Sequence, residues 1–138
     1  MHFALETDYA VRMIAVLADN STDGNESMGA AAIGEAACIP KPTALKVLRM
    51  LKDKGLIHST IGVNGGYRLA KAPGEITLAS VIEAIEGKLE ISRCLSDVYD
   101  CSRTGKDHCT CKFHNLYKSI NEKLINELSG VTFEGKNL

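Results

Sequence analysis

The periodicity of the sequence changes at Gly55. Before this glycine, apolar residues recur at the three- and four-residue spacing of helices, and after it come two short extended runs, LIHST at 56–60 and GYRLA at 66–70. The loop IGVNGG joins the two runs, and its Asn64, Gly65 and Gly66 tolerate the positive φ angles that tight hairpin turns require. The chain is therefore predicted to form helices followed by a β-hairpin.

Three helices are predicted ahead of the hairpin. The first can be capped by Thr7 or Asp8, and the second, rich in small residues, covers about 29–37. The third has Pro42 in its first turn and ends before Gly55. Its predicted inward-facing residues are Leu45, Leu48, Met50 and Leu51. This order of elements is typical of a winged helix-turn-helix, a mainly α fold with a small β-hairpin.

One block of the chain is strongly basic although the net charge is −1. Residues 41–71 carry seven lysines and arginines against one acid, whereas residues 1–40 carry one base against six acids. In this fold the second helix of the pair enters the major groove of duplex DNA, and the hairpin lies along the backbone or in the minor groove. A basic helix that faces only solvent is the alternative. The predicted contacts to a double-stranded DNA operator are Lys41, Thr43, Lys46, Arg49, Ser59, Thr60, Asn64, Gly65, Tyr67 and Arg68.

Two further helices are predicted after the hairpin. Thr77 can cap the fourth helix, and Gly87 ends it. The last helix spans about 113–128, and its apolar side lies far in sequence from the winged module. A homodimer with a twofold axis would cover that side, and folding back on its own domain is the alternative.

The segment 94–114, CLSDVYDCSRTGKDHCTCKFH, holds four of the five cysteines of the chain. Thiolates are soft ligands that select zinc or an iron–sulfur cluster over magnesium or calcium. The segment lacks the CxxC pair of zinc ribbons, and its wide spacing favours a cluster with ligands from several directions. Spacing alone leaves a zinc site, a thiol switch and an iron–sulfur carrier protein as alternatives.

Three stretches resemble the Rrf2 family of bacterial transcription regulators. They are ETDYAVRMIAVLA at 6–18, the segment 33–87 with GGYRLA and the following PGEITL, and the cysteine loop leading into CKFHNLYKSI. The resemblance implies a dimeric winged-helix repressor or activator with a [2Fe–2S] or [4Fe–4S] cluster that senses cluster supply, iron, nitric oxide or redox state. The family's motifs imply Cys94, Cys101 and Cys111 as thiolate ligands, with Cys109 replacing Cys111 or supplying a fourth thiolate.

The resemblance offers two other candidates for the fourth metal ligand. His114 in CKFH is similar to the histidine of the iron–sulfur assembly regulators, whereas Asp8 in TDYA is similar to the acid that the nitric-oxide-sensing branch donates from the partner subunit. Ile61 stands where the family's wing commonly has an arginine suited to a narrow minor groove, so a different operator is expected. Cys38, outside the loop, is predicted to be a small buried residue.

We expect a winged helix-turn-helix domain at 1–87, a cysteine-rich cluster-binding loop at 88–112, and a long C-terminal dimerisation helix with its tail at 113–138. The N-terminal residues combine apolar side chains with charges and have no basic n-region, which predicts neither a signal peptide nor a membrane span and favours a cytoplasmic location. No nucleophile and base stand in a recognisable motif, so neither an enzyme nor a small-molecule substrate is expected.

Overall fold

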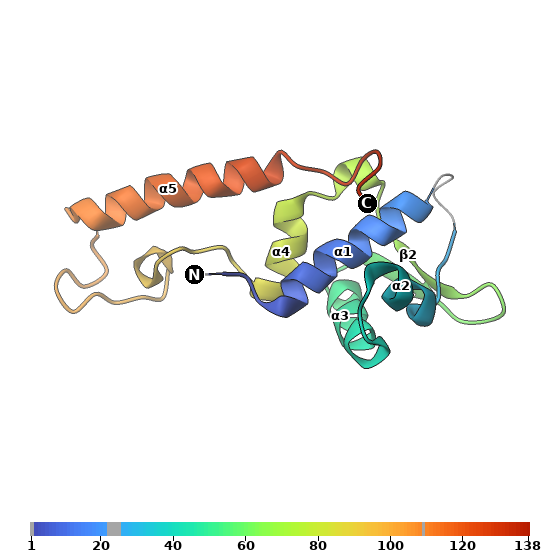
Figure 1. Cartoon of the computed structure of the whole chain (residues 1–138). Coiled ribbons are helices and arrows are strands. Elements are labelled where there is room, and N and C mark those ends of the chain that lie inside the picture. The colour runs from blue at the N-terminus through green and yellow to red at the C-terminus, as the bar shows by residue number, and fades with distance from the viewer. Residues whose placement is uncertain (1, 22–25, 109) are drawn as a thin grey trace.

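The computed structural model describes residues 2–21, 26–108 and 110–138. Its elements in chain order are α1 (Leu5–Asn20), α2 (Ala30–Ala37), α3 (Lys41–Asp53), β1 (Ile57–Thr60), β2 (Gly66–Leu69), the 3₁₀ turn η1 (Pro73–Glu75), α4 (Leu78–Glu86), the 3₁₀ turn η2 (Arg93–Leu95) and α5 (Lys112–Ser129). Helices α1 to α4 form one body, from which α5 and the loop before it extend to one side while the hairpin tip projects at the other end (Figure 1). The predicted mainly α fold with one small hairpin is confirmed.

The core lies between α1, α2, α3 and α4. Helix α1 is buried along most of its length, and Met13 and Ile14 are fully enclosed. On α3 the buried face consists of Ala44, Val47, Leu48 and Leu51. These positions follow the i, i+3, i+4, i+7 pattern of one helical face, which leaves Leu45 about a quarter turn away and 43% exposed. The prediction that Leu45 faces inward is wrong for this reason.

The turn between α2 and α3 depends on Gly34, which has no side chain, and on Cys38, which adopts a left-handed backbone conformation. A β-carbon on Gly34 would lie 2.9 Å from the carbonyl oxygen of Ile39, so only glycine permits this close approach of the turn to α2. Cys38 ends α2 with a φ of 57°, in the left-handed conformation common after helix ends. Because that conformation directs the chain sharply out of the helix, Cys38 is exposed, and the prediction that it is buried is wrong.

The wing is a two-stranded hairpin to which one residue before α2 is joined by an isolated bridge. Strands β1 and β2 pair antiparallel, with Thr60 opposite Gly66. Before α2, Met28 pairs with Tyr67 through backbone hydrogen bonds of 2.9 and 2.7 Å, which fixes the outer side of β2. Positive φ angles occur at Gly62 and Gly66 but not at Asn64, so the glycines alone supply the left-handed turns of the tip.

The ends of α1 and α4 meet through one carboxylate. Helix α1 begins at Leu5, so the prediction that Thr7 or Asp8 caps it is wrong, because both residues lie in its first turn. Instead the Glu86 carboxylate accepts hydrogen bonds from the Ala4 backbone N–H at 2.7 Å and from the Thr7 hydroxyl at 2.5 Å. A carboxylate 79 residues away from Thr7 thus replaces a local cap, and its charge complements the positive end of the α1 dipole.

The predicted boundaries of α4 are confirmed. The Thr77 hydroxyl accepts a hydrogen bond of 3.1 Å from the Ser80 backbone N–H, and Gly87 ends the helix with a φ of 82°.

The C-terminal tail returns from α5 to the start of α4. Thr132 forms an isolated antiparallel bridge with Thr77, and the Leu78 backbone N–H donates to the Val131 carbonyl at 2.8 Å. Phe133 then enters the core and is only 5% exposed. Among the described residues, no helix has both the length and the apolar character needed to cross a membrane.

Candidate DNA-binding face and cysteine pocket

The outer face of α3 presents basic side chains to solvent. Lys41, Lys46 and Arg49 are exposed, and Thr43 is half-buried at the side of the helix. Leu45, which the sequence pattern placed in the core, is exposed on the same outer side as Arg49. An apolar side chain on a recognition helix can contact the methyl group of thymine, so Leu45 joins the candidate contacts.

Lys46 is paired within the chain. Its Nζ atom lies 2.9 Å from the Oε1 atom of Glu6 in α1, and the Lys46 side chain remains 63% exposed. The hydrogen bond from Lys46 lowers the pKa of Glu6. The carboxylate therefore stays charged at neutral pH and competes with a phosphate for the lysine.

The predicted wing contacts divide into two groups. Thr60 and Asn64 are exposed near the tip, whereas Tyr67 is half-buried and packs against the core. Besides Tyr67, the half-buried residues among the predicted wing contacts are Ser59, Gly65 and Arg68. Tyr67 consequently stabilises the wing through its packing and its backbone pairing with Met28.

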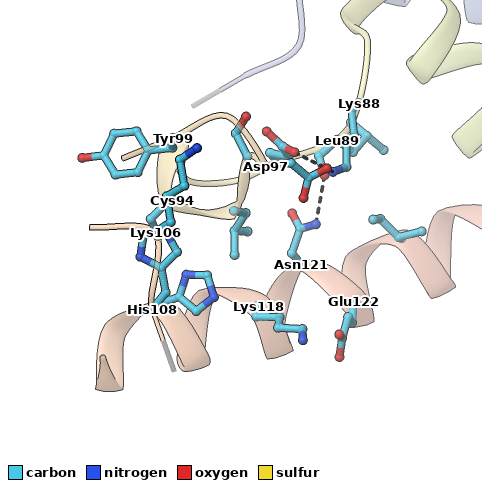
Figure 2. A pocket seen from close by; sticks show the side chains of 15 residues that line it. Lys88, Leu89, Cys94, Asp97, Tyr99, Lys106, His108, Lys118, Asn121 and Glu122 are labelled. Carbon is cyan, nitrogen blue, oxygen red and sulfur yellow. Dashed lines mark hydrogen bonds and ion pairs between the residues drawn. The ribbon is translucent and has the colours of Figure 1, made fainter. Parts of the chain in front are cut away.

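A pocket of about 560 Å³ lies between α5 and the loop that follows α4. Cys94, Tyr99 and His108 line one end of it, and Lys88 and Asn121 line the other (Figure 2). The Cys94 sulfur lies 3.4 Å from the Ser92 hydroxyl oxygen. One predicted thiolate ligand thus faces a cavity that also contains imidazole and lysine side chains.

Two histidines stack beside this cysteine. The rings of His108 and His114 are 4.8 Å apart and nearly parallel, and Tyr99 extends the stack with its ring 6.3 Å from that of His108. The Nδ1 atom of His114 is buried and has no hydrogen-bond partner in the described parts of the chain. A buried imidazole nitrogen without a partner is costly, and a ligand or metal would satisfy it.

Cys101 and Cys111 lie in surroundings that favour their thiolate forms. Backbone N–H groups of Arg103 and Thr104 lower the pKa of Cys101, and the Arg103 charge contributes. The His114 backbone N–H lowers the pKa of Cys111, with the Arg103 guanidinium again contributing. One arginine therefore supports both thiolates, the form that binds metals and reacts with oxidants.

The predicted metal ligands that the structure describes are not assembled into one site. Across residues 2–21, 26–108 and 110–138, no three histidine, cysteine or acidic side chains form a group that could hold a metal ion. Asp8 pairs with Arg12 at 2.6 Å on the exposed side of α1. Cys109 lies outside the described residues. Cluster binding would therefore require the loop to rearrange.

Asn121 is a site residue that sequence reasoning missed. Its side-chain nitrogen donates to the Leu89 carbonyl at 2.9 Å (Figure 2). Its side-chain oxygen accepts from the Ile91 backbone N–H at 3.0 Å. This buried amide fastens the start of the cysteine loop to α5. An asparagine on the polar side of a predicted helix carries no local signal of such a role.

The helix-turn-helix, the basic α3 and the hairpin define a winged helix-turn-helix transcription regulator. Residues 4–135 match the Rrf2 family, described as an iron-dependent transcriptional regulator. The chain belongs to the Rrf2 family.

Relatives and solved structures agree with this assignment. The transcriptional regulator IscR of Klebsiella pneumoniae is 30% identical over 128 residues, which cover 90% of this chain and 72% of IscR. CymR, the global cysteine regulator of B. subtilis, has a TM-score of 0.75 at 19% identity, covering 97% of this chain and 94% of CymR. The structure of T. potens IscR has a TM-score of 0.70 at 21% identity, covering 96% of this chain and 83% of that chain. The two structures share the fold of this chain.

Proposed function

We propose that this regulator binds a duplex DNA operator as a homodimer and that an iron–sulfur cluster held by its cysteine loop controls the binding. The observation that supports the proposal is a set of candidate donors at and near the pocket. Cys94 and His114 line the pocket, and the His114 Nδ1 atom, at the start of α5, is buried without a partner among the described residues. The chain between these two residues carries Cys101 and Cys111, whose surroundings favour the thiolate form. The relative named IscR supports a regulatory role.

The donor set fits an iron–sulfur cluster by its chemistry. Cys94, Cys101 and Cys111 would supply three thiolates, and His114, the cysteine at 109 or Asp8 from the partner subunit would supply the fourth ligand. When bound, such a cluster supplies a centre that reacts with oxygen and nitric oxide and is lost when iron is scarce. The family description as iron-dependent is consistent with this choice.

Asp8, one of the candidate cluster ligands, lies in the first turn of α1 next to two residues that contact other helices. The three consecutive residues 6–8 therefore connect a candidate ligand to the helices proposed to bind DNA. Glu6 pairs with Lys46 of α3, and Thr7 bonds Glu86 at the end of α4. Asp8 pairs with Arg12, whose Nη1 atom lies 3.5 Å from the Ala37 carbonyl at the end of α2. Withdrawing the Asp8 carboxylate from Arg12 would free this guanidinium and alter the contact between α1 and the helix-turn-helix.

The cysteine loop and the wing lie at opposite ends of the molecule, so α1 and α4 are the elements that can transmit a change between them (Figure 1). Two half-sites on one face of DNA lie about one helical turn apart, and a small shift in the separation of the two α3 helices changes the affinity. A complete switch requires about a 10⁴-fold difference in affinity between the two states, so a graded response is expected.

Helix α5 carries the surface proposed for dimerisation. Its exposed apolar residues are Phe113, Leu116, Tyr117 and Ile120. They recur at helical spacing on one side, and the described part of the same chain leaves them exposed to solvent. A second copy of α5 related by a twofold axis would bury this side, and its symmetry would match a palindromic operator.

The deciding experiment is anaerobic purification of wild type and Cys94→Ala, followed by visible absorption and by iron and acid-labile sulfide assays. The proposal expects a coloured wild type with stoichiometric sulfide and a bleached variant. Operator affinity is then measured by fluorescence anisotropy with and without the cluster, and equal affinities would refute the switch. A colourless, sulfide-free protein from iron-replete cells would refute the cluster itself.

A thiol switch is the second candidate, because Arg103 favours the thiolate forms of both Cys101 and Cys111. It predicts full DNA binding by metal-free reduced protein and a change after oxidation that dithiothreitol reverses. A zinc site would be equally colourless, and it is distinguished by bound zinc without sulfide.

A further inference from the structure

The tip of the wing exposes two aliphatic side chains completely. Ile61 and Val63 have relative exposures of 105% and 104%, the highest among the large hydrophobic residues that the structure describes. Neither side chain packs against its own chain, so neither contributes to the stability of the fold. Together they place a small apolar projection at the solvent-exposed end of the hairpin.

The backbone of the tip holds these side chains outward. Gly62, between them, has a φ of 122°. A β-carbon on Gly65 would lie 2.4 Å from the Thr60 carbonyl oxygen, and the Gly65 backbone N–H donates to the Gly62 carbonyl at 3.0 Å. The loop is therefore a tight turn, and both aliphatic side chains point away from it into solvent. Both residues are β-branched, so ordering them in a contact costs little rotamer entropy.

The charges around the tip identify the surface that it would meet. No aspartate or glutamate occurs between Asp53 and Glu75, whereas Lys54, Arg68 and Lys71 lie in this interval. A stretch of sequence that carries several bases and no acid has a net positive charge that attracts a polyanion, and the wing follows directly on the basic α3. The electrostatics thus favour a polyanion over a neutral or basic protein surface, and the position of the wing next to the basic α3 makes duplex DNA the polyanion that we take as the partner.

We propose that Ile61 and Val63 enter the DNA minor groove as an apolar wedge that packs between sugars and against a base step. Proteins that insert aliphatic side chains into the minor groove unstack a step and kink the duplex by roughly 20–90°. The inference rests on the proposed function, because it requires that the chain bind DNA. The inference adds that the wing recognises the operator through apolar contact and through the ease with which the DNA deforms, and not through charge.

An apolar wedge and a charged contact differ in their response to salt. Each phosphate neutralised by a cation contributes about −0.9 to the slope of log affinity against log salt, whereas an aliphatic contact releases no counterion. Replacing both side chains by serine should therefore weaken binding by about tenfold or more at every salt concentration, with the slope unchanged. Ile61→Arg should instead steepen the slope by roughly one unit.

The test measures anisotropy of a fluorescent duplex, selected from a random-sequence pool by wild-type protein, at several salt concentrations. End-to-end energy transfer in the same duplex reports its bend. The variants are Ile61→Ser with Val63→Ser, Ile61→Arg, and Val131→Ser as a matched control at an exposed valine away from the wing. Thermal melts should coincide, because the tip contributes no packing.

The expected result is a weaker and less bent complex for the double serine variant, with unchanged salt slope and with the control equal to wild type. If wild type binds and bends the duplex and the double variant matches it, the wedge is refuted while the DNA-binding function stands. If wild type selects no duplex from the pool, the proposed function itself fails. A salt slope that falls for the double variant would show a charged contact and would also overturn the wedge.

Discussion

The ammonium of Lys46 and the carboxylate of Glu6 lie 2.9 Å apart, so the first helix is bound to the helix proposed to enter the major groove. A phosphate that takes this lysine must displace an intramolecular partner. If Lys46 contacts DNA as proposed, the pair would lower the affinity for any DNA, and it would give α1 a means to influence α3.

Replacing Glu6 by glutamine should raise DNA affinity a few-fold, because Lys46 becomes available to a phosphate. The salt slope should steepen by up to about 0.9, the contribution of one added phosphate contact. Fluorescence anisotropy at several salt concentrations measures both quantities. Glu127→Gln removes the same charge from exposed α5 and serves as the control. Equal behaviour of the two variants would contradict the role assigned to the pair.

Replacing Asn121 by leucine should destabilise the protein by about 1–3 kcal/mol, because the buried Leu89 carbonyl and Ile91 N–H lose their partner. Urea unfolding measures this loss. Asn126→Leu makes the same change at an exposed position of α5 and should leave the midpoint nearly unchanged. The Asn121 variant should also retain less iron after anaerobic purification, since the start of the cysteine loop is released from α5.

Asp19 should stabilise the folded tail in a pH-dependent manner. Burial raises the pKa of its carboxyl, but hydrogen bonds from Asn137 and Leu138 outweigh this effect and lower it. A carboxyl whose pKa is lower in the folded state contributes stability above its unfolded pKa, and this contribution is lost as pH falls through the folded pKa. The difference in urea stability between wild type and Asp19→Ala should thus be largest at neutral pH and should decrease as the pH falls through the lowered pKa of Asp19. A constant difference would contradict this account.

The thiols of Cys101 and Cys111 should react at lower pH than that of N-acetylcysteine, because their lowered pKa values increase the thiolate fraction. Alkylation of reduced, metal-free protein across a pH series, read by peptide mass spectrometry, gives each midpoint. Arg103→Ala should move both midpoints upward, whereas Lys106→Ala, in the same loop, should not. Midpoints equal to that of the small thiol would contradict the assigned environment.

Ile120→Glu should dissociate the proposed homodimer, because a carboxylate in the apolar side of α5 would lose its hydration on association. Sedimentation velocity gives the mass in solution. Ser119→Glu adds the same charge one position along, outside the apolar side, and should remain dimeric. A wild-type monomer, or a dimer that tolerates Ile120→Glu, would remove α5 as the dimer interface.

Local signals predicted much of the fold. Pro42, Thr77 and Gly87 mark helix ends because proline, a hydroxyl cap and a left-handed glycine act within a few residues of themselves. The change of period at Gly55 likewise predicted the hairpin. The α3 face was less predictable, since Ala44 and Val47 occupy the core while the larger Leu45 is exposed.

The hydrogen bonds that join the cysteine loop and the first helix to the rest of the protein are made between residues far apart in the sequence. Sequence periodicity therefore does not predict them. Thr7 is buried against Glu86, and the Asn121 amide bonds a segment 30 to 32 residues earlier. The close spacing of the cysteines in the sequence was enough to recognise them as possible metal donors. Their arrangement in space could not be predicted, because a loop of this length can adopt many backbone conformations. The exposed wing tip was visible in the sequence only as Ile61 in an unusual position.

Because the tail returns to Thr77, the chain from Thr77 to Thr132 has both of its ends held at the same place. The chain leaves the start of α4, runs along that helix, crosses the cysteine segment, follows α5 and arrives back at its starting point, where Thr132 pairs with Thr77 and Phe133 is locked into the core. Because both ends of this path are fixed to the same place, a shortening of the cysteine segment cannot be taken up by movement of a free chain end. Contraction of the cysteine segment would have to appear as rotation of α5 or displacement of α4, and both partners of a twofold pair would experience it together.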